Sequence, residues 1–330
     1  MDKLKIGITH GYTNGVSYEV ILRTFENPTM LELCTPVVYG SPKLATYHRK
    51  AMELSTNFCT ISSAEDAMSE KLNIVECFQD EVKVEIGQKT EEAEKAMSCS
   101  RQAGLRDVAS HFVDALVAAP GDKLEPSELT IFINEVMRVA VLTDLKPLSQ
   151  VSALVTEENV TDKLRLFSKC LRRDFGITRP RIAVLSLNPE PGTEENDVLA
   201  PVVQKMENEQ ICAIGPVSAE QLFGSHAFCY YDGILAMYYD QASAPLQMTS
   251  QEYCIALQAD TEHVKTFPLQ DAGLSQAGKG EASLTSFCKA IYTAIDVCRN
   301  RAQYDEARQN PLPKLFHDKR EDSRRPPKAE

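Results

Sequence analysis

Three acidic residues, Asp144, Glu190 and Asp240, stand at or just beyond the ends of apolar segments that are expected to be strands. Carboxylate oxygens suit Mg²⁺ and Mn²⁺, so these side chains could hold a divalent ion if the fold brought them together. The simpler interpretation is that Asp144 and Glu190 end loops or cap helices, and that Asp240 holds a loop. The sequence leaves both interpretations open.

The histidines and cysteines give weaker chemical indications. His10 lies in a glycine turn after the first expected strand, where open α/β sheets bind ligands, although a hydrogen bond within the turn is the simpler role. His111 is expected on a helix face, and His226 and His263 in loops. None of the ten cysteines forms a Cys-x-x-Cys pair, which favours buried reduced thiols over disulfides or a zinc site. A catalytic triad is recognised by geometry and cannot be inferred from residue order.

Composition narrows the class of protein. The chain has 330 residues, of which 43% are hydrophobic, enough for about two globular domains. A net charge of -12 argues against a broad nucleic-acid surface, because phosphate binding needs clustered Lys and Arg. Neither a membrane span of roughly 18 apolar residues nor a signal peptide is recognisable, so we expect a cytoplasmic protein that does not bind membranes.

Short apolar runs alternate with amphipathic runs, a pattern typical of βα units packed into a largely parallel sheet. Ser17 is expected to cap the first helix, and Ser41 to cap a helix that has Pro42 in its first position. The expected strands are residues 4–9, 36–40, 115–119, 138–143, 181–187, 210–215 and 233–238. The other expected helices are residues 90–104, 161–175 and 284–301.

Several separate segments carry a family resemblance. Met-Tyr-Tyr-Asp-Gln at residues 237–241 resembles the metal-binding Met-Tyr-His-Asp-Gln motif of the 4-hydroxythreonine-4-phosphate dehydrogenase family. The resemblance extends with gaps from about residue 3 to residue 301, and its order of segments favours common descent. The other segments are residues 6–12, 14–15, 18–19, 39–42, 47–50, 114–120, 187–189 and 277–280.

The resemblance implies an α/β fold with two lobes and largely parallel sheets, similar to isocitrate and isopropylmalate dehydrogenases. Residues 1–125 with 275–301 are expected to form the first lobe, residues 126–274 the second lobe with the dimer surface, and residues 302–330 a polar C-terminal tail. The family works as a homodimer, oxidises an alcohol with NAD and decarboxylates the product with the help of a divalent metal. NAD and a small-molecule ligand are therefore implied, while the NAD-binding residues are not identified.

The family's three metal-binding histidines are all replaced. Their positions correspond to Leu145, Glu190 and Tyr239 in this sequence. Leucine cannot coordinate a cation, so these replacements argue against the family's metal site in this chain. Asp144, Glu190 and Asp240 form the alternative ligand set. Carboxylate ligands of this kind hold the metal in related β-decarboxylating dehydrogenases.

Substrate-binding motifs are altered as well. The interval between Pro120 and Arg138 is too short for the family's Gly-His-Thr-Glu segment, and Lys265 stands where the family has an arginine. Asn188 and Lys265 remain as candidate substrate-binding residues, and Asp240 as a candidate catalytic residue.

Two hypotheses follow from this pattern. The first is a catalytically impaired relative kept as a binding or assembly partner, either as a homodimer or as a heterodimer with an intact paralogue. The second is an active NAD-dependent oxidoreductase that acts on a different hydroxy acid with a carboxylate-bound divalent metal.

Overall fold

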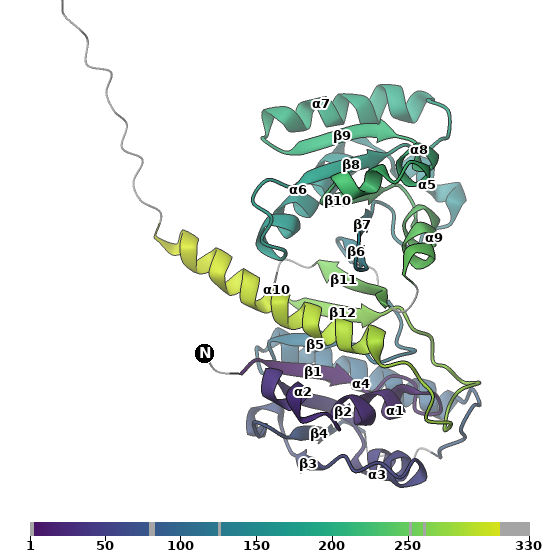
Figure 1. Cartoon of the computed structure of the whole chain (residues 1–330), viewed down its shortest axis with the longest axis vertical. Helices are drawn as coiled ribbons and strands as arrows, with labels where there is room; N and C mark the ends of the chain where they lie inside the picture. Colours follow the sequence, from purple (N-terminus) through teal and green to yellow (C-terminus); the bar gives the residue numbers. More distant parts are fainter. Residues whose placement is uncertain (1–2, 79–82, 125–126, 251–252, 260–261, 311–330) are drawn as a thin grey trace, which may run out of the picture.

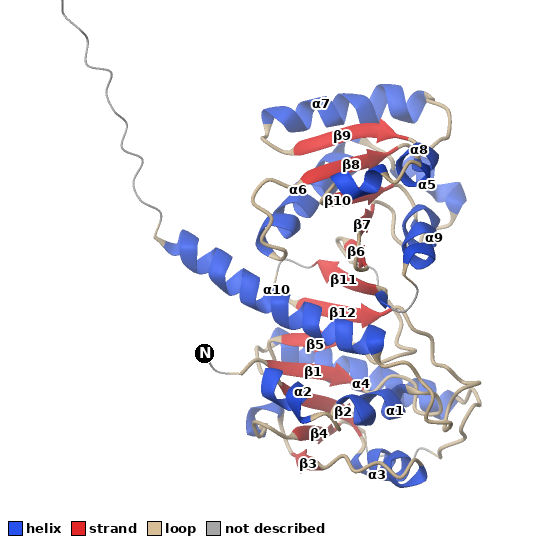
Figure 2. Cartoon of the chain, in the orientation of Figure 1, coloured by secondary structure: helices blue, strands red, loops and turns tan. Residues whose placement is uncertain are grey.

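A single sheet runs through the molecule in the computed structural model, which describes residues 3–78, 83–124, 127–250, 253–259 and 262–310. Within these residues the sheet has twelve strands in the order β3-β4-β2-β1-β5-β12-β11-β6-β7-β10-β8-β9. Figures 1 and 2 show the N-terminal part of the chain at one end of the sheet and the middle part at the other. The expected mixed α/β class with a largely parallel sheet is confirmed.

The N-terminal half of the sheet is built from βα units. Its strands β1, β2, β4 and β5 pair in parallel and are almost completely buried, as near-continuous apolar runs require. The elements are β1 (Lys5–Thr9), α1 (Ser17–Thr24), α2 (Pro28–Leu33), β2 (Thr35–Gly40), α3 (Pro42–Ala51), β3 (Phe58–Ile61), η1 (Ala64–Asp66), β4 (Leu72–Glu76), α4 (Glu91–Ala109) and β5 (Ala115–Val117).

The remaining elements form the other half of the sheet and the long C-terminal helix. They are β6 (Thr130–Ile133), β7 (Arg138–Val141), α5 (Leu148–Leu154), α6 (Glu157–Arg173), β8 (Arg181–Leu185), η2 (Glu194–Leu199), α7 (Ala200–Asn208), β9 (Cys212–Val217), α8 (Ala219–Gly224), η3 (Ala227–Tyr230), β10 (Gly233–Ala236), α9 (Tyr239–Thr249), β11 (Ile255–Ala259), β12 (Val264–Pro268) and α10 (Thr285–Gln309).

Antiparallel strands join the two halves at the centre of the sheet. β11 pairs antiparallel with both β12 and β6, and β6 pairs antiparallel with β7. β12 in turn lies parallel to β5, with Val264 opposite Ala115. Strands from the late part of the chain therefore link the two ends of the sheet, and the expected division into two lobes stays a prediction.

Helix starts follow side-chain caps at some positions and not at others. Ser41 caps α3 as expected, since its Oγ accepts the N–H of Leu44. Ser17 does not cap α1, because its Oγ donates to the carbonyl of Pro120 at 2.6 Å and accepts the N–H of Tyr12 at 3.0 Å. His111 is not on a helix face but follows α4 with a left-handed φ of 58°.

Helix α10 packs across the centre of the sheet, against β5, β11 and β12, and against α6 (Figure 1). It runs to Gln309, beyond the expected end at residue 301, so residues 302–309 of the expected tail are helical. Residues 311–330 of that tail lie outside the described residues.

A buried ion pair fastens α10 to the end of α6. Arg301 Nε and Nη2 donate to the two carboxylate oxygens of Asp174 at 2.8 and 3.0 Å, and both side chains are almost completely buried. One turn further along α10, Arg173 pairs with Asp305 in the same bidentate manner, but Asp305 is half exposed. These contacts hold the middle of the chain against the C-terminal helix.

In the described parts of the chain, no helix has both the length and the apolar character that crossing a membrane requires.

Candidate functional site

The ends of two neighbouring parallel strands bring residues 143–146 and 237–239 together. β7 and β10 pair with Ala236 opposite Val141, so both strands end at the same edge of the sheet. Thr143 Oγ1 then donates to the carbonyl of Met237 at 2.8 Å and fixes the two loops to each other. This pairing explains why Leu145 and Tyr239 lie close together although they are far apart in sequence.

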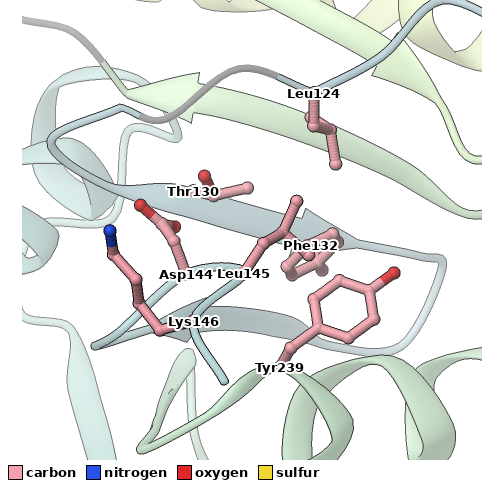
Figure 3. Close-up of a pocket in the computed structure, with 7 residues that line it drawn as sticks. All are labelled: Leu124, Thr130, Phe132, Asp144, Leu145, Lys146 and Tyr239. Atoms are coloured by element: carbon pink, nitrogen blue, oxygen red, sulfur yellow. The ribbon is translucent and has the colours of Figure 1, made fainter. Parts of the chain in front are cut away.

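A small pocket opens between these loops and β6 (Figure 3). Its volume is about 90 Å³. In Figure 3 the Asp144 carboxylate turns toward Thr130, and the Leu145 side chain turns toward Phe132. The lining residues are Leu124, Thr130, Phe132, Asp144, Leu145, Lys146 and Tyr239. The site therefore has one polar end and otherwise apolar walls.

Tyr239 forms one of these walls. Its ring meets the ring of Phe132 edge to face, with centroids 5.5 Å apart and an interplanar angle of 84°. Burial raises the pKa of the Tyr239 phenol, and the neighbouring charge of Asp240 raises it further. The phenol therefore keeps its proton at neutral pH.

Asp144 supplies the charge at the polar end. Its backbone adopts a left-handed φ of 48°, which aspartate tolerates better than most residues. Burial raises its pKa, while the Thr130 hydroxyl and the nearby ammonium of Lys163 act in the opposite direction. Among the described residues, none provides a hydrogen-bond partner for its buried Oδ1.

Glu190 and Asn188 belong to a separate loop after β8. Glu195 is the centre of that loop, because its carboxylate accepts the backbone N–H groups of Leu187, Asn188 and Gly192, each at 2.8 Å. Although burial opposes it, the N–H donors of Asn188 and Gly192 hold the pKa of Glu195 below its ordinary value. The Asn188 amide also donates to this carboxylate, and Glu190 is exposed.

The 237–241 segment is held by its glutamine. Gln241 Oε1 accepts the N–H of Met237 at 2.9 Å, and its Nε2 donates to the carbonyl of Ser186 at 2.9 Å. Asp240 is exposed in the first turn of α9 and does not line the pocket. Gln241 thus has a structural role that does not depend on a metal.

The three carboxylates of the alternative metal set do not converge. Throughout the described ranges, no group of three His, Cys, Asp or Glu side chains is placed to hold one metal ion. Asp144 lines the pocket, whereas Glu190 and Asp240 are exposed outside its lining, so a shared ion at these three residues stays a prediction.

Lys265 lies in the centre of the sheet, away from this pocket. It is in β12 opposite Gln258 of β11, and it lines a smaller cavity of about 10 Å³ with Thr9, Arg101 and Asp122. The structure does not bring the two candidate substrate-binding residues, Asn188 and Lys265, to one site.

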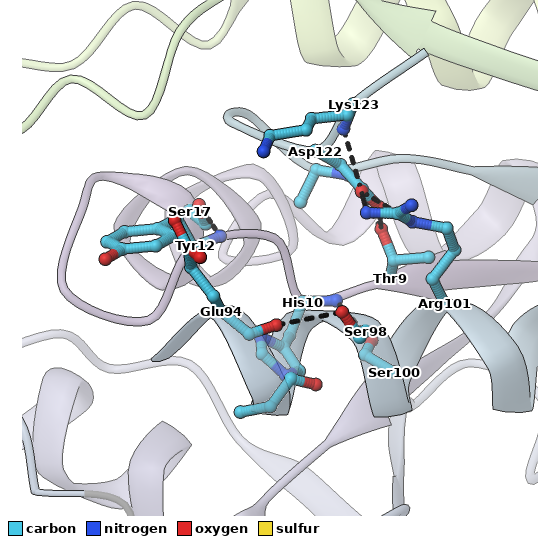
Figure 4. A network of polar contacts seen from close by, with 12 residues as sticks. Thr9, His10, Tyr12, Ser17, Glu94, Ser98, Ser100, Arg101, Asp122 and Lys123 are labelled. Carbon is cyan, nitrogen blue, oxygen red and sulfur yellow. Dashed lines mark hydrogen bonds and ion pairs between the residues drawn. The ribbon is translucent and has the colours of Figure 1, made fainter. Parts of the chain in front are cut away.

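Asp122 connects three elements around this smaller cavity (Figure 4). Its Oδ2 accepts from the Thr9 hydroxyl at 2.8 Å, and its Oδ1 accepts from Arg101 Nη2 at 2.8 Å. Burial raises the pKa of Asp122, although Arg101 and Thr9 counteract this effect. This network ties β1, α4 and the segment after β5 together, and nothing in the sequence pattern indicated it.

His10 faces the protein interior rather than a ligand site. Its Nε2 lies 3.1 Å from the carbonyl of Ala96, and its ring stacks on Tyr18 at 5.6 Å. Burial lowers the pKa of His10 to about 4. Its Nε2 contacts α4, whereas the simpler interpretation had expected a hydrogen bond within the turn.

Sequence reasoning also missed Thr130 and Phe132, which line the main pocket from β6. The run Leu129–Ile133 is rich in β-branched and apolar residues and could have been recognised as a strand.

Comparison with known proteins gives consistent matches. A family model described as "Pyridoxal phosphate biosynthetic protein PdxA" matches residues 125–294. The chain is 41% identical to 4-hydroxythreonine-4-phosphate dehydrogenase of Bacteroides thetaiotaomicron, over 98% of this chain and 96% of that protein. It is 26% identical to the enzyme of the same name from a Sulfurihydrogenibium species, over 90% of this chain and 99% of that protein.

The alignment with the Bacteroides protein spans 350 positions, more than the 330 residues of this chain. That relative therefore contains residues that have no counterpart here.

Solved structures agree in fold. A 4-hydroxythreonine-4-phosphate dehydrogenase from Klebsiella pneumoniae superposes with a TM-score of 0.74 at 20% identity, over 90% of this chain and 98% of the other. One from Burkholderia phymatum gives a TM-score of 0.72 at 20% identity, over 90% and 99% of the two chains. At this identity the likeness shows the fold alone.

Proposed function

The chain belongs to the PdxA family of pyridoxal phosphate biosynthetic proteins, and from this membership we propose that it keeps the family framework as a binding or assembly partner with impaired dehydrogenase chemistry. The observation that carries the proposal is the lining of the main pocket. Leu145 and Tyr239 occupy two of the three positions at which the family resemblance expects metal ligands, and they form apolar walls with Phe132.

The residues present do not fit the divalent metal that the family implies. Leu145 has no donor atom, Tyr239 packs its ring against Phe132, and Glu190 is exposed in another loop. Among the described residues that line the pocket, Asp144 is the one carboxylate, and the charges of Lys163 and Lys146 act to lower its pKa. We therefore derive no catalytic step that depends on a metal at this position.

The residues of the pocket can still bind a molecule. Asp144 and Thr130 offer hydrogen-bonding groups at one end, and Leu145, Phe132 and Tyr239 exclude water at the other. A site of this kind can orient a ligand by one polar contact, but it lacks a clamp for a phosphate or carboxylate group. NAD, which the family resemblance implies, is retained in the proposal as a ligand to be tested separately.

We also propose that the protein forms a dimer through residues 126–274. Its partner is either a second copy of the chain or an intact paralogue. Exposed apolar side chains in this part of the chain support a partner surface: Val136, Leu145, Leu148 and Met248 are 53%, 60%, 64% and 87% exposed. A cytoplasmic location is also part of the proposal.

The test is NAD reduction with 4-phosphohydroxy-L-threonine in the presence of Mg²⁺ or Mn²⁺. The Bacteroides relative, assayed in parallel, is the positive control. We expect this chain to be at least about a thousandfold slower, which corresponds to roughly 4 kcal/mol of lost transition-state stabilisation. Turnover within tenfold of the control would refute the proposal.

The alternative of an active enzyme on another hydroxy acid is tested in the same assay. It requires turnover of an unphosphorylated hydroxy acid and calorimetric binding of Mg²⁺ or Mn²⁺ below millimolar concentration. It also requires that Asp240→Ala change at least one of these two quantities. Failure of any one of these requirements removes this alternative.

A further inference from the structure

Another pocket, the α2–β3 pocket, lies between helix α2 and the starts of strands β3 and β4 (Figure 1). Strands β2, β1, β5, β12 and β11 separate it from β6 and the main pocket. We propose that the α2–β3 pocket binds a small zwitterion with an apolar body, which is the chemistry of a free apolar amino acid. The ammonium group would meet Glu26, the carboxylate would meet Lys71, and the apolar side chain would lie on the floor of the pocket. This inference goes beyond the proposed function and does not rest on it.

The first argument is the size of the pocket and its apolar floor. The volume is about 360 Å³, which is in the range of pockets that bind small molecules. Phe25, Leu31 and Phe58 line the floor, and Leu31 and Phe58 are only partly buried by the rest of the protein. Small-molecule sites combine such apolar surface with a few oriented polar groups. The floor therefore suits an alkyl or aryl group, and the polar rim selects the rest of the ligand.

The second argument is an oriented carboxylate on the rim. Glu26 Oε1 accepts the backbone N–H and the hydroxyl group of Ser55, at 2.9 and 2.7 Å. These two hydrogen bonds fix the Glu26 side chain against the loop before β3, and within the described residues its Oε2 accepts none. Glu26 is exposed and lines the pocket, so a ligand can reach it. A hydrogen bond from an ammonium group to a carboxylate is about twice as strong as a neutral one.

The third argument is a cation that lines the same pocket without pairing with Glu26. Lys71 is exposed, and its Nζ lies 3.8 Å from Met68 Sδ, which is a weak acceptor. In the part of the chain that the structure describes, no ion pair joins Lys71 to Glu26. Glu70, the other carboxylate of the lining, is already paired with Lys3 at 3.1 Å. A zwitterion can bridge the two remaining charges, whereas a ligand with a single charge leaves one of them uncompensated.

Contacts outside the ligand space hold the walls of the pocket in place. Thr56 Oγ1 donates to the carbonyl of Leu22 at 2.8 Å, and Arg49 Nη1 donates to the carbonyl of Thr56 at 3.3 Å. On the side of α2, Lys3 Nζ donates to the carbonyl of Leu31 at 3.3 Å. A site that is already ordered loses less conformational entropy when a ligand binds. The loop before β3 and helix α2 therefore form the site without rearrangement.

The experiment measures binding of L-leucine and L-phenylalanine to the full-length protein by calorimetry, and it locates the bound ligand by chemical-shift changes at residues 26–31 and 55–59. For each amino acid, the amide derivative lacks the carboxylate and the N-acetyl derivative lacks the ammonium group. Glycine lacks the apolar side chain. We expect the better-binding of the two amino acids to bind at least about tenfold more tightly than its two derivatives and glycine, a ratio equivalent to roughly 1.4 kcal/mol.

Two variants assign the charges to their partners. Glu26→Gln keeps an oxygen for Ser55 but removes the charge, and it should abolish the preference for the amino acid over its N-acetyl derivative. Lys71→Gln should abolish the preference for the amino acid over its amide. Both positions are exposed, so neither change removes a buried contact. The matched controls are Glu207→Gln and Lys279→Gln, which are exposed and outside the pocket lining and should bind the amino acid like the wild type.

The inference is overturned if neither amino acid shifts the resonances of residues 26–31 and 55–59 at about 10 mM. It is also overturned if an amide, an N-acetyl derivative or glycine binds as tightly as the amino acid, or if Glu26→Gln and Lys71→Gln bind all probes like the wild type. None of these outcomes depends on NAD reduction, so failure of the inference and failure of the proposed function are separate results.

Discussion

Breaking the buried ion pair between Asp174 and Arg301 should destabilise the whole molecule. Both side chains are almost completely buried, and two hydrogen bonds of 2.8 and 3.0 Å join them. The substitution Arg301→Met keeps the length of the side chain but leaves the Asp174 carboxylate buried without its counter-charge. Removing one partner of such a pair typically costs about 3–5 kcal/mol.

The expected change in melting temperature follows from the length of the chain. At about 2.1 cal/mol/K per residue, a protein of 330 residues unfolds with an entropy of roughly 0.7 kcal/mol/K. A loss of about 4 kcal/mol therefore lowers the melting temperature by roughly 6 °C. Differential scanning calorimetry of wild type and variant measures this shift.

Two further variants complete the test. Arg173→Met breaks the neighbouring pair with the half-exposed Asp305 on the same two helices, and it should cost at most about 1 kcal/mol. The double variant Asp174→Leu with Arg301→Met removes both charges and should recover most of the lost stability. Equal shifts for Arg301→Met and Arg173→Met would refute the reasoning that burial sets the cost.

The remaining predictions concern pH and local packing. Burial lowers the pKa of His10 and His48 to about 4, so the unfolded chain binds more protons than the folded one between pH 6.5 and 4. Stability should fall as the pH drops through this window, by up to about 3 kcal/mol per histidine, and urea unfolding of His48→Phe should show a weaker pH dependence. Gly15→Ala should lower the melting temperature strongly, since the added Cβ would lie 2.1 Å from the Ala272 carbonyl oxygen. Gly224→Ala should have at most a small effect on the melting temperature, because its Cβ would meet no atom of the described residues within 4 Å. Glu195→Ala should speed amide hydrogen exchange at Leu187 and Asn188, because the buried acceptor of their N–H groups is lost, at a cost of about 1–3 kcal/mol. Unchanged exchange would contradict the role given to Glu195.

Local sequence signals predicted strands β1 and β2 well, whereas β3 and β4 at the edge of the sheet were not expected. β1 and β2 lie within one residue of the expected strands, because continuous apolar runs identify strands buried on both faces. Ser41 followed by Pro42 predicted the start of α3 correctly, since a cap acts through neighbouring residues alone. Ser17 had the same local signal, but the distant carbonyl of Pro120 binds its hydroxyl instead.

Non-local contacts limited how much of the candidate site could be predicted from the sequence. The meeting of Leu145 and Tyr239 was implied by the family resemblance, but the contribution of Phe132 depends on the antiparallel insertion of β6 beside β7. The separation of Asn188 from Lys265 likewise depends on strand order, which local patterns do not encode. Sequence therefore identified which residues had changed, and the structure determined which of them share a site.

The central position of β12 has a consequence for synthesis of the chain. The first strands are complete once residue 117 has been made, but the edge of β5 pairs with residues 264–266 and is packed by α10 at residues 285–309. During translation that edge of β5 stays unpaired while well over a hundred further residues are added. Unpaired strand edges invite association with other chains. The nascent protein thus has a long interval in which a chaperone, or the matching strands of a second copy, could occupy the place that β12 later takes.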